Sequence, residues 1–372
     1  MRTDERIRVL LQRTPGDIPA FQGDLDRVVA RVRVRRGRKR ATVIAVSIVV
    51  LAGVALPLGL LYGLGSSSHP ATSPSPPSPP VRPVLAAQTH VSSGAVDVAV
   101  SDGAVWVPGF GAVSRLDPAT DRVVGRVRTP GTGDYSSIAV GEGSVWVTAG
   151  RGGVYRIDPA INRVVATVHV GGFVQGIAVG AGRVWVTRPT EGPGDLIRID
   201  PQTNEFAGPA IKVGPGPIDV TYGLGAVWVE NTSPPSVMRV DPTTGHVSTV
   251  PVVGAVAVGY GSLWAASDDS LTRFDPETGR IVATVPVPRA QGIAIGAGEL
   301  LVLASPRSSS PTLFYPIKHT TALWEVDPDT NRIVGKGSRL DALQPIAIAA
   351  NSESVWIADY DGGTITRFRL AP

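Results

Sequence analysis

Two aspartates, Asp97 and Asp219, occupy the same place in two copies of an internal repeat, at the start of an expected inner strand. Three glutamines, Gln175, Gln291 and Gln344, are expected close to them. Carboxylate and amide groups gathered in this way could hold a polar ligand or a cation, or they could hold ordered water. We treat these five residues as a candidate channel-mouth site, without assigning any of them as a catalytic residue or a metal ligand.

A second candidate site consists of aromatic side chains in the expected loops of one face. The sixth repeat carries an insert, residues 305–321, that is much longer than the corresponding loops elsewhere. A long loop in a compact fold is usually either functional or disordered, and aromatic side chains are the usual anchors of binding surfaces. They can also fold down to cover the rim of the protein. The candidate ligand-binding residues are Phe314, Tyr315, Lys318 and His319 of the insert, together with Phe110, Tyr135, Phe173 and Tyr360.

Acidic residues replace the aromatic ones in the loops of the third to fifth repeats. The rim is therefore expected to divide into an aromatic arc and an acidic arc. The acidic residues are Glu191, Asp195, Glu230, Asp268 and Asp269.

Most recognisable catalytic chemistry is missing from the sequence. The chain has no Cys, which excludes disulfides, thiolate metal sites and cysteine nucleophiles. It contains no H-E-x-x-H, G-x-S-x-G or Walker motif, and its five His are scattered. We therefore expect a binding protein without a cofactor or metal, and keep as the alternative an enzyme with its site at the channel mouth.

The candidate residues are positioned by a repeat that covers residues 84–370. Each copy reads as four short strands, with a Val-Trp-Val strand second and a turn such as "RIDPAINR" after the third. In that turn Asp and Pro start the reversal, and Asn, Asp or Gly accepts the left-handed conformation. The Trp positions are 40, 39, 43, 36, 37 and 55 residues apart, which is typical of propeller blades. They are Trp106, Trp146, Trp185, Trp228, Trp264, Leu301 (in place of Trp) and Trp356.

The pattern therefore predicts an all-β fold, a seven-bladed β-propeller, with the Trp residues packed between blades. The Arg before each Asp-Pro turn is expected to pair with an Asp of the same or the next blade. The segment "VLAAQTHV", residues 84–91, resembles the fourth strand of a copy, whereas the last copy ends without one. We expect this N-terminal strand to close the last blade.

The rhythm "RIDPxTxRVVATVxVG" of the repeat resembles YVTN-type seven-bladed propellers, and the chain is also similar to virginiamycin B lyase-like propellers, in a membrane-anchored actinobacterial form. The resemblance implies the fold, but propellers host binders and enzymes alike. The lyases use a His/Glu arrangement with a divalent metal, and no residue of this sequence is matched to it.

The residues before the repeat predict a membrane anchor. Residues 41–64 contain no charged side chain, and a helix of that length spans a bilayer. Residues 1–40 hold 12 Arg or Lys and 5 Asp or Glu, so the positive-inside rule places this basic head in the cytoplasm. Residues 65–83 are a Pro/Ser-rich linker, and residues 84–372 form the extracytoplasmic propeller.

These features predict the partners and the location of the protein. We expect a single-pass protein of the cell membrane whose propeller binds a cell-envelope protein, peptide or glycan. The basic head could instead bind nucleic acid, but the apolar segment directly after it favours a membrane, so no nucleic-acid partner is expected. A further alternative is a sensor that signals to a cytoplasmic partner through residues 1–40.

Overall fold

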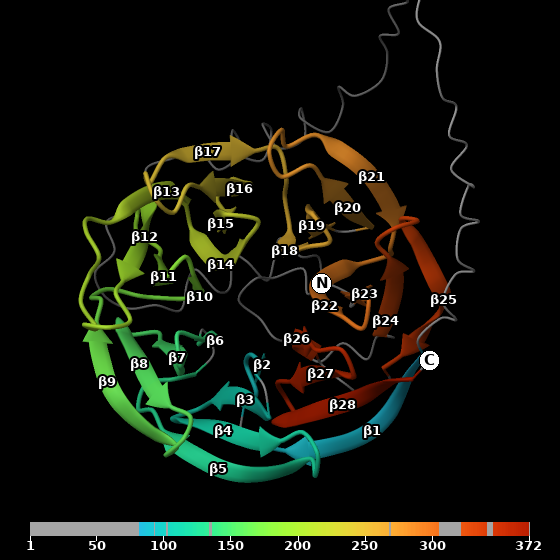
Figure 1. The fold of residues 1–372 in the computed structure, drawn as a ribbon, viewed down its shortest axis with the longest axis horizontal. Helices are drawn as coiled ribbons and strands as arrows, with labels where there is room; N and C mark the ends of the chain where they lie inside the picture. Colours follow the sequence, from blue (N-terminus) through green and yellow to red (C-terminus); the bar gives the residue numbers. More distant parts are fainter. Residues whose placement is uncertain are drawn as a thin grey trace, which may run out of the picture. The chain divides into compact units, whose positions relative to one another are not determined.

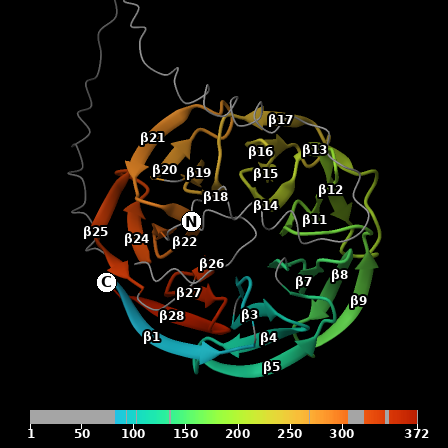
Figure 2. The same ribbon diagram turned by 180° about the vertical axis from the view of Figure 1, so that it is seen from behind.

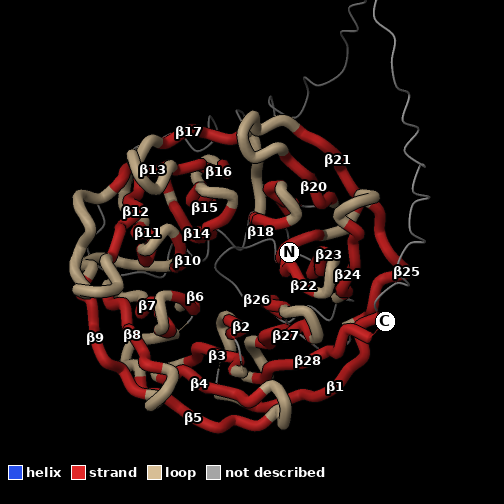
Figure 3. Tube along the Cα trace, in the orientation of Figure 1, coloured by secondary structure: helices blue, strands red, loops and turns tan. Residues whose placement is uncertain are grey.

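The computed structural model describes residues 82–371 apart from 93, 102, 134–135, 268, 305–320 and 341–344. These residues form seven four-stranded antiparallel sheets, the blades, arranged in a ring around a common axis (Figures 1 and 2). The regular elements of the described part are strands (Figure 3). The predicted span, residues 41–64, lies outside the described residues, and within them no helix is long and apolar enough to cross a membrane.

The strands occupy four positions from the axis outwards, and blades 1 to 7 follow the chain. The inner strands are β2 (Ala99–Ser101), β6 (Ile138–Gly141), β10 (Ile177–Gly180), β14 (Pro217–Gly223), β18 (Ala255–Gly259), β22 (Ala290–Gly296) and β26 (Pro345–Ala350). The second strands are β3 (Ala104–Gly109), β7 (Ser144–Ala149), β11 (Arg183–Arg188), β15 (Ala226–Thr232), β19 (Ser262–Ser267), β23 (Glu299–Ala304) and β27 (Ser354–Asp359).

The third and outer strands complete the blades. The third strands are β4 (Ala112–Asp117), β8 (Gly153–Asp158), β12 (Pro193–Ile199), β16 (Pro235–Val240), β20 (Ser270–Phe274), β24 (Ala322–Asp327) and β28 (Thr364–Ala371). The outer strands are β5 (Arg122–Arg128), β9 (Arg163–His169), β13 (Ile211–Pro215), β17 (Val247–Val250), β21 (Ile281–Pro286), β25 (Arg332–Arg339) and, in blade 7, β1 (Arg82–His90).

The predicted closure of the ring is confirmed. β1 pairs antiparallel with β28, from Arg82 opposite Ala371 to His90 opposite Thr364. Blade 7 therefore has the strand order β26, β27, β28, β1, and the first strand of the propeller joins its last strand in one sheet (Figure 1). The strand begins two residues earlier than the repeat pattern predicts.

Burial follows from the position of each strand in its blade. β3, β7 and β27 are buried at every residue, because neighbouring blades cover both faces of a second strand. Outer strands such as β5 alternate between exposed residues and residues that are half-buried or buried, since only one of their faces is covered. The six repeated Trp side chains are 0 to 2% exposed, which confirms that they pack between blades.

The predicted Asp pair is present at Arg367, whose Nη1 lies 3.2 Å from Asp121 Oδ1 of blade 1, but other repeated Arg residues join the next blade through carbonyl and Asn acceptors. The Arg115 guanidinium lies over the Trp106 ring, 5.2 Å from its centroid. Its Nη1 donates to the Pro159 carbonyl of blade 2 at 2.7 Å and to Asn162 Oδ1 at 2.9 Å. We call this arrangement the Arg clasp. It recurs from Arg156 to blade 3, from Arg273 to blade 6 and from Arg367 to blade 1.

The clasp is missing where the left-handed position of the next blade's turn is Gly, which has no side-chain acceptor. Each clasped turn has Asn or Asp at its left-handed position, as at Asn162 with φ 52°. Blades 4 and 5 have Gly245 and Gly279 there, and the Arg residues facing them turn to other acceptors: Arg198 to the Pro209 carbonyl and Arg239 to Glu277.

Candidate functional site

The loops that carry the predicted sites lie on one rim of the ring. In blade 1, the turn after β3 exchanges backbone hydrogen bonds with the loop after β5: Gly111 donates to Thr132 and Thr129 donates to Gly111. The same pairing joins Val91 to Gly363 between the blade 7 turn and the loop that leads into blade 1. These turns and interblade loops therefore form one surface, here called the loop rim, and the Asp-Pro turns form the opposite rim.

Phe110 and Tyr360 meet on the loop rim, although they are far apart in the sequence. Their rings pack edge to face, with centroids 6.3 Å apart and planes at 70°. Phe110 remains 46% exposed. The ring sits between two interblade loops at glycines: a Cβ at Gly94 would lie 2.4 Å from it and a Cβ at Gly133 3.2 Å from it. Because neither glycine has a side chain, the two positions leave room for the Phe110 ring at the junction of blades 7 and 1.

Phe173 also packs against a glycine, at a separate position on blade 2. It is 37% exposed, and a Cβ at Gly150, in the turn between β7 and β8, would lie 3.0 Å from its ring. The remaining members of the predicted arc, Tyr135, Phe314, Tyr315, Lys318 and His319, lie outside the described residues. The structure therefore brings Phe110 and Tyr360 together and places Phe173 one blade further along.

Asp97 and Asp219 occupy equivalent positions, as predicted, each two residues before the residue opposite the repeated Trp. Asp97 bridges two blades: its Oδ1 accepts from Val98 N–H at 2.8 Å and its Oδ2 from Ile138 N–H of blade 2 at 3.0 Å. Asp219 accepts from its own neighbour, Val220 N–H, at 2.8 Å. Blade 3 approaches it closely, because a Cβ at Gly176 would lie 2.7 Å from Asp219 Cα.

The surroundings of both carboxyl groups favour their protonated forms. Burial, with a smaller contribution from the charge of Asp219, raises the pKa of Asp97 from 3.8 to about 6, against the two backbone N–H donors that lower it. Burial also raises the pKa of Asp219 to about 6. Water reaches Asp219 but Asp97 is only half-exposed, so solvent screening offsets more of the shift at Asp219.

The glutamines contribute unequally to this candidate site. Gln175 binds through its backbone, where its carbonyl accepts from Thr148 Oγ1 at 2.7 Å and its N–H donates to the Thr187 carbonyl at 3.1 Å. Gln291 lies in β22, and Gln344 lies outside the described residues. Within the described part of the chain, no group of three or more His, Cys, Asp or Glu is placed to hold a metal ion.

One member of the predicted acidic arc is part of an ion-pair network instead. Asp195 lies within β12 and is 3% exposed. Arg188 Nη2 and Lys212 Nζ each lie 2.7 Å from its carboxylate oxygens. Burial works to raise the pKa of Asp195, but Lys212 and Arg188 outweigh it and hold the pKa below its usual value. Asp195 therefore ties three strands of blade 3 together, and the prediction that it belongs to an acidic loop surface is wrong.

The strand register explains why these three charged residues meet. Asp195 stands opposite Arg188 on one side and Lys212 on the other, so these side chains share one face of the blade. Assigning Asp195 to a strand rather than to a loop would have revealed the pairing.

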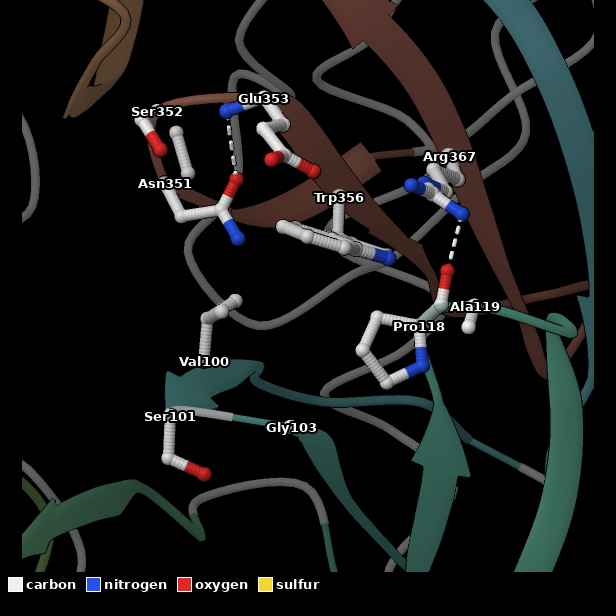
Figure 4. A pocket seen from close by; sticks show the side chains of 11 residues that line it. Val100, Ser101, Gly103, Pro118, Ala119, Asn351, Ser352, Glu353, Trp356 and Arg367 are labelled. Atoms are coloured by element: carbon white, nitrogen blue, oxygen red, sulfur yellow. Dashed lines mark hydrogen bonds between the residues drawn. The ribbon is translucent and has the colours of Figure 1, made fainter.

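A pocket of about 370 Å³ opens on the opposite rim, between blades 7 and 1 (Figure 4). Its walls include Trp356, Glu353 and Pro118. Arg367 donates to the Pro118 carbonyl, and Asn351 Oδ1 accepts from Glu353 N–H at 2.9 Å. Arg367 and Asn351 are thus already hydrogen-bonded within the protein. We therefore interpret the pocket as part of the junction that the Arg367 clasp forms between blades 7 and 1.

Comparisons with known proteins agree with this architecture. A family model described as "Repeat of unknown function (DUF6923)" matches residues 168–292, from the end of β9 into β22. No curated protein matches the chain.

Solved structures resemble the whole ring. Virginiamycin B lyase from Staphylococcus aureus superposes with a TM-score of 0.60 at 18% identity, covering 76% of this chain and 98% of that one. Kuenenia stuttgartiensis hydrazine synthase superposes with a TM-score of 0.59 at 13% identity, covering 76% and 97%. At such identities the likeness concerns the fold, and the chain is a seven-bladed β-propeller that resembles the lyase and carries a match to the DUF6923 repeat.

Proposed function

We propose that this protein is a membrane-anchored, extracytoplasmic binding protein, and that its loop rim takes up a protein, peptide or glycan of the cell envelope. A β-propeller is often a ligand-binding scaffold. The observation that carries the proposal is the contact between Phe110 and Tyr360. Two blades present aromatic rings at one point of the rim, and Phe110 keeps nearly half of its surface free for a ligand.

The proposed binding surface is tested by replacing Phe110. The full chain and its Phe110→Ala variant are incubated with cell-envelope extract, and the bound protein and glycan are measured. Loss of an aromatic anchor at the centre of an interface commonly costs about 2 kcal/mol, or roughly thirtyfold in affinity. Phe206→Ala is the matched control, because Phe206 is 52% exposed and follows an Asp-Pro turn on the opposite rim. Equal binding by all three chains would refute a loop-rim site at Phe110.

The anchor is supported by the uncharged residues 41–64 after a basic head. Protease added to intact cells should remove the propeller and leave residues 1–40 protected. Digestion of the head from outside would refute the proposed orientation.

One observation favours an enzyme as the second candidate. Two carboxyl groups have a pKa of about 6, Asp97 just before the inner strand of blade 1 and Asp219 on the inner strand of blade 4, and this is the acid strength that proton transfer near neutral pH requires. A binding protein of the loop rim should be indifferent to Asp219→Asn, whereas an enzyme working at the inner strands should lose turnover with that change.

A further inference from the structure

The outer edge of the propeller is strongly basic on one side. The seven outer strands contain nine Arg or Lys and no Asp or Glu. Eight of the nine lie on β25, β1, β5 and β9, which belong to the consecutive blades 6, 7, 1 and 2 (Figure 1). The ninth, Lys212 on β13, is neutralised by Asp195. We call the edge formed by these four strands the basic arc.

Protection of sheet edges does not explain this distribution. Charged side chains on an edge strand hinder its pairing with other chains, and every blade exposes such an edge. The outer strands of blades 4 and 5, β17 and β21, nevertheless contain no Arg or Lys. The charge is therefore collected in one arc of the ring.

Blade 1 shows what this edge offers to a partner. Arg122, Arg126 and Arg128 are exposed on one face of β5. None of the three makes an ion pair with another described residue. Val124, on the same face, is 54% exposed. Positive charge and aliphatic surface are thus interleaved along the strand.

The neighbouring edge of blade 7 continues the aliphatic surface. Val84 and Leu85 of β1 are 55% and 63% exposed. β1 is joined to the start of β5, because Thr89 Oγ1 donates to the Asp121 carbonyl at 2.8 Å. Cations beside exposed aliphatic groups suit the interface of an anionic bilayer, where phosphates take the charge and the acyl boundary takes the side chains. A soluble anionic polymer would use the charge alone.

The point at which the chain enters the ring favours the same partner. Residues 65–81 separate the expected span from Arg82, the first residue of β1, which gives a reach of about 50 Å if they are extended. β1 lies in the middle of the basic arc (Figure 2). The edge nearest along the chain to the membrane is therefore the basic and aliphatic one.

We propose that the basic arc docks the propeller edge-on against the anionic lipid headgroups of the membrane that carries it. This inference rests on the membrane anchoring proposed above. Edge-on docking leaves both rims of the ring accessible, so the loop rim can bind its ligand while the arc holds the lipid.

The absence of Cys from the chain makes single labels possible. The full chain, carrying a fluorophore at Val124→Cys on β5 or at Val282→Cys on β21, is reconstituted in phosphatidylcholine vesicles with or without phosphatidylglycerol. A nitroxide on the lipid headgroups quenches the fluorophore where the labelled strand contacts the bilayer surface. We expect quenching of the Val124→Cys label in phosphatidylglycerol vesicles, reversed by salt, and little at Val282→Cys, which is 56% exposed on blade 5, outside the basic arc.

Charge variants make the test specific. Each Arg near an anionic surface is worth about fivefold in binding, so removing three from β5 should weaken docking about a hundredfold. The control removes the same charge from blades 3 and 5 and the loop after β21, and should dock normally. The test variant is Arg122→Gln/Arg126→Gln/Arg128→Gln, and the control is Arg183→Gln/Arg280→Gln/Arg289→Gln.

The outcomes separate docking from anchoring. Equal quenching of both labels, or quenching without phosphatidylglycerol, overturns the docking. Binding of polyphosphate through β5 without lipid quenching would assign the arc to a soluble polyanion and also overturn it. Flotation with vesicles in high salt tests the membrane anchor alone, because salt screens the docking. A chain that floats but shows no quenching in low salt would support the anchor and refute the docking. A chain that does not float would refute both.

Discussion

The Arg clasp predicts how single serines affect the stability of the ring. In blade 2, Ser144 Oγ accepts from the Nε of Arg156 at 2.8 Å, and blades 5 and 7 repeat this bond at 2.8 and 2.9 Å. In blade 1 the equivalent residue is Ala104, and the Nε of Arg115 is buried without a partner among the described residues. Ser144→Ala should therefore create the defect that Ala104→Ser repairs.

The size of each effect follows from the cost of a buried, unpaired donor. Removing one partner of a buried hydrogen bond costs about 1–3 kcal/mol, and more when the group is charged. We expect Ser144→Ala to lower the free energy of unfolding by about 2 kcal/mol. Ala104→Ser should raise it by about 1 kcal/mol, since the added bond must also order the hydroxyl. In a domain of this size, 1 kcal/mol corresponds to roughly 2–4 °C in Tm.

Thermal unfolding followed by circular dichroism measures both changes in the full chain. Ala226→Ser in blade 4 is an independent repeat of the gain, because the Nε of Arg239 is also buried without a described partner. Ser248→Ala, at an exposed position of β17, controls for the substitution itself. Unchanged midpoints in Ser144→Ala and Ala104→Ser together would refute the argument, and would mean that water already satisfies the Arg115 donor.

Three further changes test other parts of the structure. A chain beginning at Ser92 lacks β1 and should aggregate or melt well below one beginning at Arg82, since β28 becomes an unpaired edge; equal Tm values would contradict closure by β1. The pKa of Asp97 is raised from 3.8 to about 6, so Asp97 contributes stability to the fold that is fully present below pH 3.8 and is lost as the pH rises through 6. Denaturant titrations across this window should show the unmodified chain losing stability relative to Asp97→Asn. A constant difference between the two free energies of unfolding would refute the shift. Replacing residues 305–321 by a short Gly/Ser turn should leave Tm unchanged, because loop length contributes little to stability, but should weaken ligand capture if Phe314 and Tyr315 are anchors; unfolding would show that the insert is structural.

The architecture could be predicted from the sequence because each blade records it locally. A buried second strand needs large apolar residues, which is why Trp recurs at Trp106 and its equivalents. The Asp-Pro turns mark the end of every third strand except the last. The missing fourth strand of the last copy and the unmatched strand at residues 84–91 then indicate that the two ends of the repeat region share a sheet. These signals are short-range, so they can be recognised without knowing the contacts.

The contacts between blades and within the rim were decided by the tertiary structure. Whether an Arg forms the clasp depends on the turn of the next blade, which lies 47 residues away in the case of Arg115 and Asn162. Repetition showed that the Arg residues were structural, but the partner atom is a Pro carbonyl, which no side-chain pattern reveals. The Asn and Gly alternatives in the turns were visible, and their consequence for the clasp was not.

For the candidate site, too, the sequence determined some features and the tertiary structure decided others. The sequence by itself placed Phe110 and Tyr360 in loops of one face, because alternate turns of an antiparallel blade fall on the same rim. Only the folded ring shows that the two rings touch at 6.3 Å, since that contact requires blade 7 to return beside blade 1 and two glycines to leave room for Phe110. Folding likewise packs neighbouring blades around Asp97 and Asp219, and the resulting desolvation, absent from an extended chain, raises the pKa of each carboxyl group, although water still reaches Asp219.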